Sequence, residues 1–441
     1  MKVKGSVTIF LGLSISFFII LIEVLAKGCI INAERERFEV SADIAINSVL
    51  GEFNKTLYSK YDVLYIDASY LGKTPKIENV KDRILMYMRE NTENVLNVPG
   101  GPWGNINLSS INIERFQGAC ANSGMSFRNQ ANIYVEDKAD LNSLLGMVKG
   151  VEEKKDGIES ARNENVLEDW TNLMEMISGK ELPKKVNPVT GEIEIVELDN
   201  PADSYFSQSR SDIFSLVNVS MPQSVSFNTD TLISNRGAIN TELLGNINNS
   251  KDIFITYLVD RMSCYLRPKD HLLSCELEYI IHSSNSDYEN FKYVVNEIYK
   301  IQLAENYRHV STDGYYISKA YAEAEALEVS TLDPTFIEPV ANSILYAYAF
   351  IEALKDMNSI LGGGTGDDGL NYEQYLIAMM FMEDDSRLNY KGMDLVELEV
   401  RRLDMNQSFS MDWCIERIDF LMKAKGSGPE EIVRRRMYGY Y

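Results

Sequence analysis

The chain begins with a run of apolar residues that is long enough to span a membrane. No charged residue occurs between Val7 and Ile22, and the run continues past Glu23 to Ala26. From Ser6 to Ala26 a helix would rise about 31 Å at about 1.5 Å per residue, which matches a hydrocarbon core of about 30 Å. The residues that we expect to form or flank this anchor are Lys2, Lys4, Phe10, Phe17, Phe18, Glu23 and Lys27.

The charges around the run predict its orientation. Lys2 and Lys4 precede it, and positive charge favours the cytoplasmic side of a membrane. We therefore expect a single-pass anchor with a cytoplasmic N-terminus and with the bulk of the chain outside the cell membrane. The alternatives are a signal peptide cleaved after Ala26, a lipid attached to Cys29, and a buried core helix. Cleavage is disfavoured because the run exceeds about 15 residues and Glu23 lies in the cleavage motif.

After Lys27 the pattern becomes amphipathic. Apolar residues recur at the spacing of one helix face, and the other face carries charged residues from Glu34 to Asp43. The apolar face consists of Ile31, Phe38, Ala42, Ala45, Ile46, Val49 and Phe53. Since no proline occurs before Pro75, the pattern predicts one helix from about residue 6 to about residue 58. Its apolar face either packs on its own domain or binds another protein, and a second copy could be joined to it through Cys29.

Helices predominate in the rest of the predicted structure, with short strands between them. The predicted helices are 77–94, 125–165, 166–178, 252–265, 286–307, 339–357, 371–382 and 387–404. The predicted strands are 63–67, 106–116, 274–282 and a C-terminal hairpin that turns at 426–429. Ser286 and Glu289 match a capping box, and Asn371 matches a helix cap. Segments 97–105 and 361–369 are predicted loops.

The fold class is therefore α+β: a transmembrane helix, a stalk helix, and a helix-dominated external region that ends in a β-hairpin. We expect five parts. They are the anchor (1–27), the stalk (28–60), a first external α+β region (61–182), a linker with an edge hairpin (183–212) and a C-terminal helix-rich domain (213–441).

Composition excludes one class of partner. Hydrophobic residues make up 45% of the chain, which is enough for a buried core. The 65 acidic residues outnumber the 43 basic ones, for a net charge of −22. A chain this acidic is repelled by phosphate backbones, so we expect no nucleic-acid binding.

Signatures of catalysis are missing from the sequence. It contains no G-x-x-x-x-G-K-[ST], G-x-S-x-G, H-E-x-x-H or C-x-x-C motif. The glycine-rich loop at 361–369 lacks a lysine, and Asp367 and Asp368 would repel a phosphate. We therefore expect no enzyme activity, no cofactor and no metal site. Cys264 and Cys275 flank a turn that contains Pro268 and are the pair that could form a disulfide outside the membrane.

Several stretches resemble a known family. The N-terminal KGSVTIFL, Glu23, and Ser41-Ala42-Asp43 resemble the membrane anchors of TadE/TadG-like proteins of Tad-type (tight adherence, Flp) pilus systems. The external part resembles the uncharacterised anchored proteins found with Tad-like loci in Gram-positive bacteria. The stretches that carry this second likeness are Lys60-Tyr61-Asp62, Asn200-Pro201-Ala202-Asp203, Cys275-Glu276-Leu277-Glu278-Tyr279-Ile280 and Tyr372-Glu373-Gln374-Tyr375-Leu376.

The resemblance implies a role rather than a reaction. It points to a membrane-anchored, extracytoplasmic structural or assembly component of a Tad-like pilus or secretion system. The partners that we expect are other Tad-like envelope proteins, or a second copy, bound through the stalk. The chain departs from type IV-like pilins in one respect, because Phe10 occupies the position five residues after Gly5 where those proteins carry a glutamate. The alternative is an anchored envelope enzyme or ligand-binding protein unrelated to pili.

Overall fold

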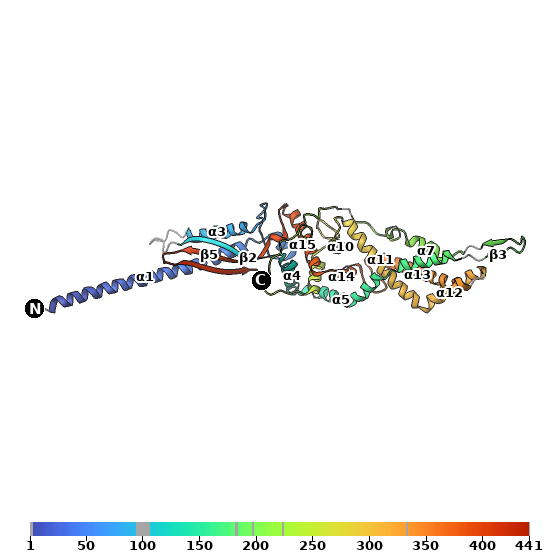
Figure 1. Cartoon of the computed structure of the whole chain (residues 1–441), viewed down its shortest axis with the longest axis horizontal. Coiled ribbons are helices and arrows are strands. Elements are labelled where there is room, and N and C mark those ends of the chain that lie inside the picture. Colours follow the sequence, from blue (N-terminus) through green and yellow to red (C-terminus); the bar gives the residue numbers. More distant parts are fainter. Residues whose placement is uncertain are drawn as a thin grey trace. The chain divides into compact units, whose positions relative to one another are not determined.

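The computed structural model describes residues 3–93, 106–180, 184–195, 198–222, 225–331 and 334–440. The chain forms two compact units, each built from segments that are far apart in the sequence (Figure 1). Unit 1 comprises Met1–Tyr134, Leu232–Asn249 and Met393–Tyr441, and unit 2 comprises Val135–Thr231 and Ser250–Gly392. The predicted α+β class is confirmed. The predicted linker at 183–212 lies inside unit 2, and the predicted domain at 213–441 is divided between the two units.

Unit 1 combines the N-terminal helix with an antiparallel sheet. Its elements are α1 (Val3–Leu50), α2 (Lys55–Tyr61), β1 (Ile66–Asp67), α3 (Ile77–Glu93), β2 (Asn107–Gly118), most of α4 (Ala121–Asp137), α8 (Ile233–Arg236), the end of α15 (Asp385–Leu403), the 3-10 turn Met411–Trp413, β5 (Cys414–Lys425) and β6 (Glu431–Gly439). The sheet is built on β5, which pairs with β2 along one edge and with β1 and β6 along the other. The predicted C-terminal hairpin is therefore confirmed as β5 and β6.

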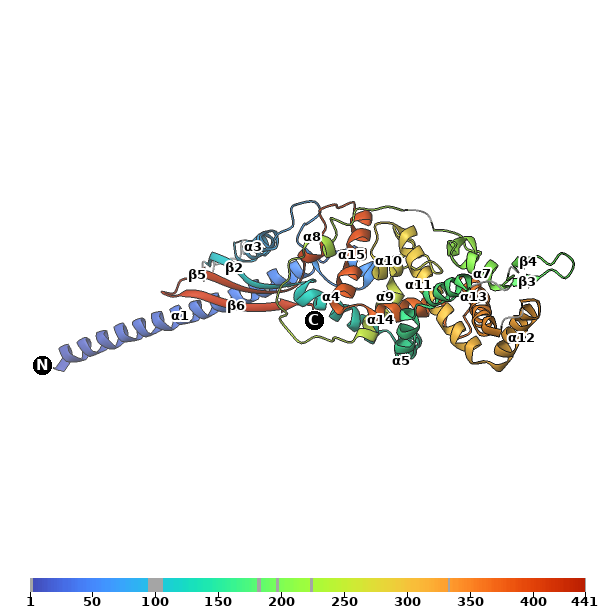
Figure 2. The ribbon, with the colours of Figure 1, turned by 45° about the vertical axis from the view of Figure 1, so that its right-hand side comes forward.

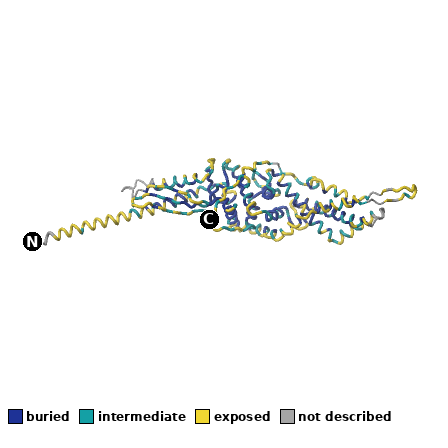
Figure 3. Tube along the Cα trace, in the orientation of Figure 1, coloured by how far each residue is buried: buried dark blue, intermediate teal, exposed yellow. Residues whose placement is uncertain are grey.

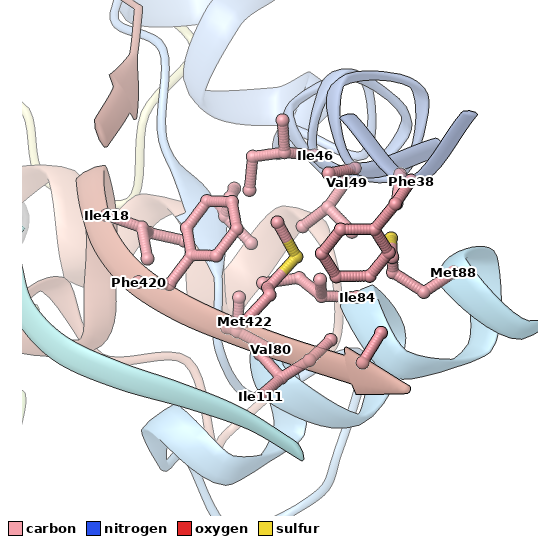
Figure 4. Close-up of a cluster of buried hydrophobic side chains, with 14 of the residues drawn as sticks. Phe38, Ile46, Val49, Val80, Ile84, Met88, Ile111, Ile418, Phe420 and Met422 are labelled. Carbon is pink, nitrogen blue, oxygen red and sulfur yellow. The ribbon is translucent and has the colours of Figure 1, made fainter. Parts of the chain in front are cut away.

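The core of unit 1 lies between α1, α3 and the sheet (Figure 4). The second half of α1 contributes Phe38, Ala42, Ala45, Ile46 and Val49, all of which are buried. Across from them lie Ile418, Phe420 and Met422 of β5, with Val80, Ile84 and Met88 of α3. The amphipathic face that the sequence predicts thus packs on its own unit, which was one of the two alternatives for it.

The stalk helix ends earlier than predicted. Helix α1 stops at Leu50 rather than near residue 58, and the chain turns through Gly51 before α2 begins. Asn54 caps α2, because its side chain accepts a hydrogen bond of 2.9 Å from the backbone N–H of Leu57. Phe53 therefore lies in the turn, where its ring packs on that of Tyr58, and not on the helix face. The cap formed by the Asn54 side chain begins a new helix here, so α1 does not continue through this segment.

Unit 2 consists mostly of helices. Its elements are the 3-10 turn Ala139–Leu141, α5 (Asn142–Asn163), α6 (Val166–Gly179), β3 (Lys184–Val186), β4 (Ile193–Ile195), α7 (Ala202–Ser209), the 3-10 turn Ile213–Ser215, α9 (Lys251–Arg261), α10 (Glu276–His282), α11 (Asp287–Thr312), α12 (Gly314–Thr331), the 3-10 turn Pro334–Phe336, α13 (Ile337–Leu361), α14 (Tyr372–Met382) and the start of α15. The predicted edge hairpin is present as β3 and β4. The predicted linker also contains α7, and α12 was not predicted.

The strand predicted at 274–282 is wrong, because this segment forms helix α10. The alternation of Glu276 and Glu278 with apolar residues suggested a half-exposed strand. Both glutamates are in fact buried and accept hydrogen bonds from backbone N–H groups of the preceding loop. Tertiary partners for the carboxylates therefore replaced the solvent that the prediction had assumed.

The two predicted helix caps have different outcomes. Asn371 forms a complete capping box with Gln374 at the start of α14. Ser286 is the N-cap residue of α11, but its side chain makes no capping hydrogen bond, so the predicted box with Glu289 is wrong in its contacts. The loop predicted at 97–105 lies outside the described residues.

Candidate functional site

In the first half of α1, all residues from Ser6 to Cys29 except Ser14 are exposed, and most of them are apolar. This helix is the one among the described residues that is long and apolar enough to cross a membrane, and none of its most apolar window is buried in the protein. Phe10, Phe17 and Phe18 are 71%, 63% and 59% exposed. Figure 3 shows the change from exposed to buried along α1, and Figure 2 shows the exposed half extending beyond the sheet. Isolated apolar residues are common on protein surfaces, but a continuous patch of this size indicates contact with lipid or protein.

Of the charged residues predicted to flank the anchor, Glu23 and Lys27 pair with each other on the surface of α1. The Nζ of Lys27 donates a hydrogen bond of 2.7 Å to Glu23, one helical turn earlier, and both side chains are exposed. Such i,i+4 pairs stabilise a helix by about 0.2–0.5 kcal/mol. Lys2 lies outside the described residues, and the side chain of Lys4 is likewise not described.

The tip of the β5–β6 hairpin contacts α1 just beyond the exposed half. Glu34 is almost fully buried and accepts hydrogen bonds from the backbone N–H of Ser427, at 2.7 Å, and from its Oγ, at 2.5 Å. Gly426 permits this approach, because a Cβ at that position would lie 2.4 Å from Glu34 Oε2. Ile31, the first residue of the predicted stalk face, lines a small cavity beside the tip. This contact marks where α1 passes from its exposed half into the packed part of unit 1.

The stalk face is not available to another protein in this fold. Five of its seven residues belong to the core of unit 1. The opposite side of α1 carries two apolar residues that the sequence pattern did not single out, Val40 and Ile44, which are 56% and 45% exposed. They are four residues apart and therefore lie on the same side of the helix. In the sequence they could be identified as apolar residues outside the predicted face.

The cysteines form no disulfide in this structure. Cys29 is exposed, and the other four, including Cys264 and Cys275, are buried free thiols. Burial raises the pKa of Cys264 to about 12, and it raises the pKa of Cys275 still further. Both thiols are therefore protonated near neutral pH and are poor nucleophiles.

A polar cavity in unit 2 lies between α11, the end of α13 and the loop at 362–371. Its volume is about 370 Å³. Its lining residues are Gln302, Glu305, Asn306, His309, Asp356, Asp367 and Asp368. Asp367 and Asp368 lie in the predicted loop at 361–369. The sequence did not indicate a cavity there, because the other lining residues come from helices that are distant along the chain. Among the residues that the structure describes, no three His, Cys, Asp or Glu side chains are arranged to hold a metal ion.

A second cavity, of about 420 Å³, lies in unit 1 beside the turn between α1 and α2. Asp67 and Asp404 line it, together with Leu71, which is 77% exposed. Burial raises the pKa of Asp67, and the nearby Asp404 carboxylate raises it further. Both carboxylates accept hydrogen bonds from neighbouring side chains, from Ser69 and from Asn54 respectively.

Comparison with known proteins gives one family and no individual relative. No curated protein and no solved structure matches the chain. A family model described as a family of unknown function (DUF5702) matches residues 191–365 and 362–426, which together exceed half of the 441 residues. The match includes all the lining residues of the unit 2 cavity and excludes α1. The chain therefore belongs to the DUF5702 family.

Proposed function

We propose that this protein is a single-pass, membrane-anchored extracytoplasmic component of a Tad-like pilus or secretion system, with a structural or assembly role. The observation that carries the proposal is the continuity of α1. Its exposed apolar half passes without a break into a half that is built into the core of unit 1. A helix shared in this way makes the external unit rigid with respect to its anchor.

The hairpin tip sets how close unit 1 lies to the membrane. Ala26 ends the apolar run, and Glu34, which holds the tip, follows about 12 Å further along the helix at about 1.5 Å per residue. The polar headgroup zone of a bilayer extends about 5–8 Å beyond the hydrocarbon core on each side. The packed part of unit 1, which starts at the hairpin tip, would therefore lie just outside the headgroups. The Glu23–Lys27 pair would lie at the outer boundary, where a charge costs less than at the bilayer centre.

The pilus role is supported by the resemblance of the anchor and of the external stretches to Tad-type proteins. Because the stalk face is buried in unit 1, contact with other envelope proteins would use the opposite side of α1. Val40 and Ile44 mark that side above the membrane, and the apolar half continues it within the membrane. Side-by-side packing of helices through such a surface is a common mode of association in membranes.

Topology is tested first, with single cysteines. Cys29→Ser removes the one exposed thiol among the five cysteines, all of which the structure describes. In that background, Glu36→Cys places a thiol beyond the anchor, and Ser6→Cys places one at its expected cytoplasmic end. A membrane-impermeant maleimide should label the first in intact protoplasts and the second only after permeabilisation. The reverse pattern would contradict the orientation, and a mature N-terminus after Ala26 would indicate a cleaved signal peptide.

The assembly role is tested by photocrosslinking in the native host. A photoreactive residue at Val40 should give adducts to another envelope protein encoded with the pilus genes, or to a second copy. The same residue at Val49, which is buried in the core of unit 1, is the matched control. Deleting the gene should also abolish filaments or secretion. Intact filament output without the protein, together with no adduct specific to Val40, would rule out the assembly role.

The alternative, an anchored ligand-binding protein, is favoured by one observation. The unit 2 cavity lies inside the region that defines the family, whereas the anchor lies outside it. This alternative concerns unit 2 and is compatible with the same anchor.

A further inference from the structure

The net charge of this protein comes entirely from one of its two units. Unit 1 contains 23 acidic and 23 basic residues, so it has no net charge. Unit 2 contains the other 42 of the 65 acidic residues but only 20 of the 43 basic ones, and it therefore carries the whole net charge of −22. The field of unit 2 attracts cations from solution, and a concave site lined by one sign of charge concentrates that attraction.

The cavity in unit 2 has such a lining. Four carboxylates contribute to it, and none of its lining residues is a lysine or an arginine. One of the four, Glu305, pairs with Arg308 at 2.9 Å, and the nearby Lys355 pairs with Glu352 at 2.8 Å. Burial raises the pKa of Asp356, and Asp367 and Asp368 raise it further by repulsion. A cation in the cavity would relieve that repulsion.

Two buried amides give the cavity a second, independent property. Gln302 and Asn306 are 1% and 4% exposed, and both line the cavity. The amide nitrogen of Gln302 donates to Tyr375, and that of Asn306 donates to Asp356 at 2.8 Å. Among the described residues, nothing donates to their side-chain oxygens, Gln302 Oε1 and Asn306 Oδ1, and neither oxygen is sealed from the cavity. Both oxygens are therefore free to accept from a donor that enters the cavity.

The loop that closes the cavity is fitted to those oxygens. A Cβ on Gly366 would lie 3.0 Å from Gln302 Oε1 and 3.1 Å from Asp368 Oδ1. The oxygens of Asp356 and Asp368 are held in place by the backbone N–H of Asp367, at 3.2 Å, and by that of Leu370, at 3.0 Å. The lining is therefore rich in fixed acceptors and offers few donors. That chemistry suits a group with several N–H donors and a positive charge.

We propose that this cavity binds a guanidinium or ammonium group, and that the group is an arginine or lysine side chain of a basic segment in a partner protein. The cavity volume of about 370 Å³ lies within the range of about 300–1,000 Å³ that is typical of ligand sites. Asp356 and Asp368 bind separate protein donors, and no three carboxylates among the described residues are arranged to hold a metal ion, which favours a multi-donor organic cation as the ligand. This proposal rests on unit 2 and stands independently of the pilus role.

The test measures binding of a fluorescein-labelled triarginine peptide to the full chain in detergent at about 50 mM salt. Two variants alter the cavity, and each has a matched control elsewhere in unit 2. Asp367→Asn removes a lining charge, whereas Asp156→Asn removes an exposed charge on α5. Gly366→Ala crowds the acceptors without changing charge, whereas an alanine Cβ at Gly314 would meet nothing within 4 Å.

We expect Asp367→Asn and Gly366→Ala each to weaken binding by about three- to tenfold, and the two controls to change it by less than about twofold. A triglutamine peptide should not bind. Equal losses in Asp367→Asn and Asp156→Asn, with Gly366→Ala unchanged, would show that the peptide senses only the overall field, and the proposal would fail. Thermal melts identify any variant that has lost its fold. If one cavity variant is unfolded, binding by the other cavity variant decides whether the proposal holds.

Competition distinguishes the sources of the cation. Displacement by triarginine or trilysine at lower concentration than by spermidine supports a protein segment. Spermidine as the stronger competitor would retain the cation site but exclude a protein segment as its ligand. Displacement by sub-millimolar Ca²⁺, lost in Asp367→Asn, would make this a metal site and overturn the proposal.

Discussion

Buried carboxylates hold the loop that precedes α10 in unit 2. Glu276 accepts from the backbone N–H of Ser263 at 2.7 Å, and Glu278 accepts from that of Tyr265 at 2.9 Å. Glu278 also accepts a hydrogen bond of 2.8 Å from the hydroxyl of Tyr372. These contacts tie the loop and α14 to α10 at the level of single residues. They also explain why glutamates occupy positions without access to water.

Glu278 should make stability depend on pH. Burial raises its pKa from 4.5 to about 7, so the unfolded chain loses this proton at a lower pH than the folded one. Its stabilising contribution is complete below about pH 4.5 and is lost as the pH rises through about 7, by about 2–4 kcal/mol. In Glu278→Gln, melts of the full chain should lose this slope, and the variant should exceed the wild type in stability at pH 8. Glu289→Gln, at an exposed position on α11, should retain the wild-type slope, and an unchanged slope in Glu278→Gln would contradict the assignment.

Glu34 should be required for the hairpin tip to stay on α1. Its carboxylate accepts two hydrogen bonds from Ser427. A hydrogen bond to a charged group contributes about 1.5–3 kcal/mol to stability. Glu34→Ala should therefore destabilise the tip by about 1–3 kcal/mol, read as faster hydrogen exchange at 426–432. Glu36→Ala, at an exposed position two residues on, is the control and should leave exchange unchanged. Equal exchange in the two variants would show that the tip is held by other contacts.

At the scale of elements, α1 combines an exposed apolar half and a packed amphipathic half in one helix. Its first half matches a hydrocarbon core in length, and its second half packs on α3 and β5. The second half buries one face only, as expected for an amphipathic helix on a sheet. The β5–β6 hairpin covers that face from Glu34 to Leu50, through Arg434 to Glu39 and through the hydroxyl of Tyr440 to the backbone carbonyl of Leu50.

Phe38 should be the most costly side chain to truncate in the second half of α1. It is fully buried in the core of unit 1, and Phe→Ala changes in cores cost about 3–5 kcal/mol. Val40, two residues on, is 56% exposed, so Val40→Ala should cost less than about 0.5 kcal/mol. Hydrogen exchange in α3 and β5 reports the difference. If Phe38→Ala leaves their protection intact, α1 does not belong to the core of unit 1.

At the scale of the whole molecule, the division of charge should separate the two units in their response to salt. Like charges in unit 2 repel one another, and salt screens that repulsion over a Debye length of about 10 Å at 0.1 M. Raising salt from about 10 mM to about 0.5 M should therefore slow hydrogen exchange in α11 and α13 more than in α3 and β5. An equal response in both units would contradict a charge-driven difference.

The sequence by itself determined the features that depend on neighbouring residues. A membrane-length helix at the N-terminus follows from an unbroken apolar run, and α14 begins where Asn371 and Gln374 cap each other. The C-terminal hairpin follows from alternating strands around a Gly-Ser-Gly-Pro turn. Each of these signals lies within one continuous stretch of the chain, so its physical cause is present in the local pattern.

Only the tertiary structure decided which faces are covered and by what. From the sequence, the stalk face could pack on its own domain or bind another protein. In the structure β5 and α3 bury it. The strand prediction at 274–282 failed because the partners of Glu276 and Glu278 lie in a loop whose position the pattern does not encode. The unit 2 cavity joins α11, α13 and the loop after it, so its acceptor-rich lining exists only once these segments meet. Burial and electrostatic fields depend on all neighbours in space, and for that reason they were beyond the reach of the local sequence.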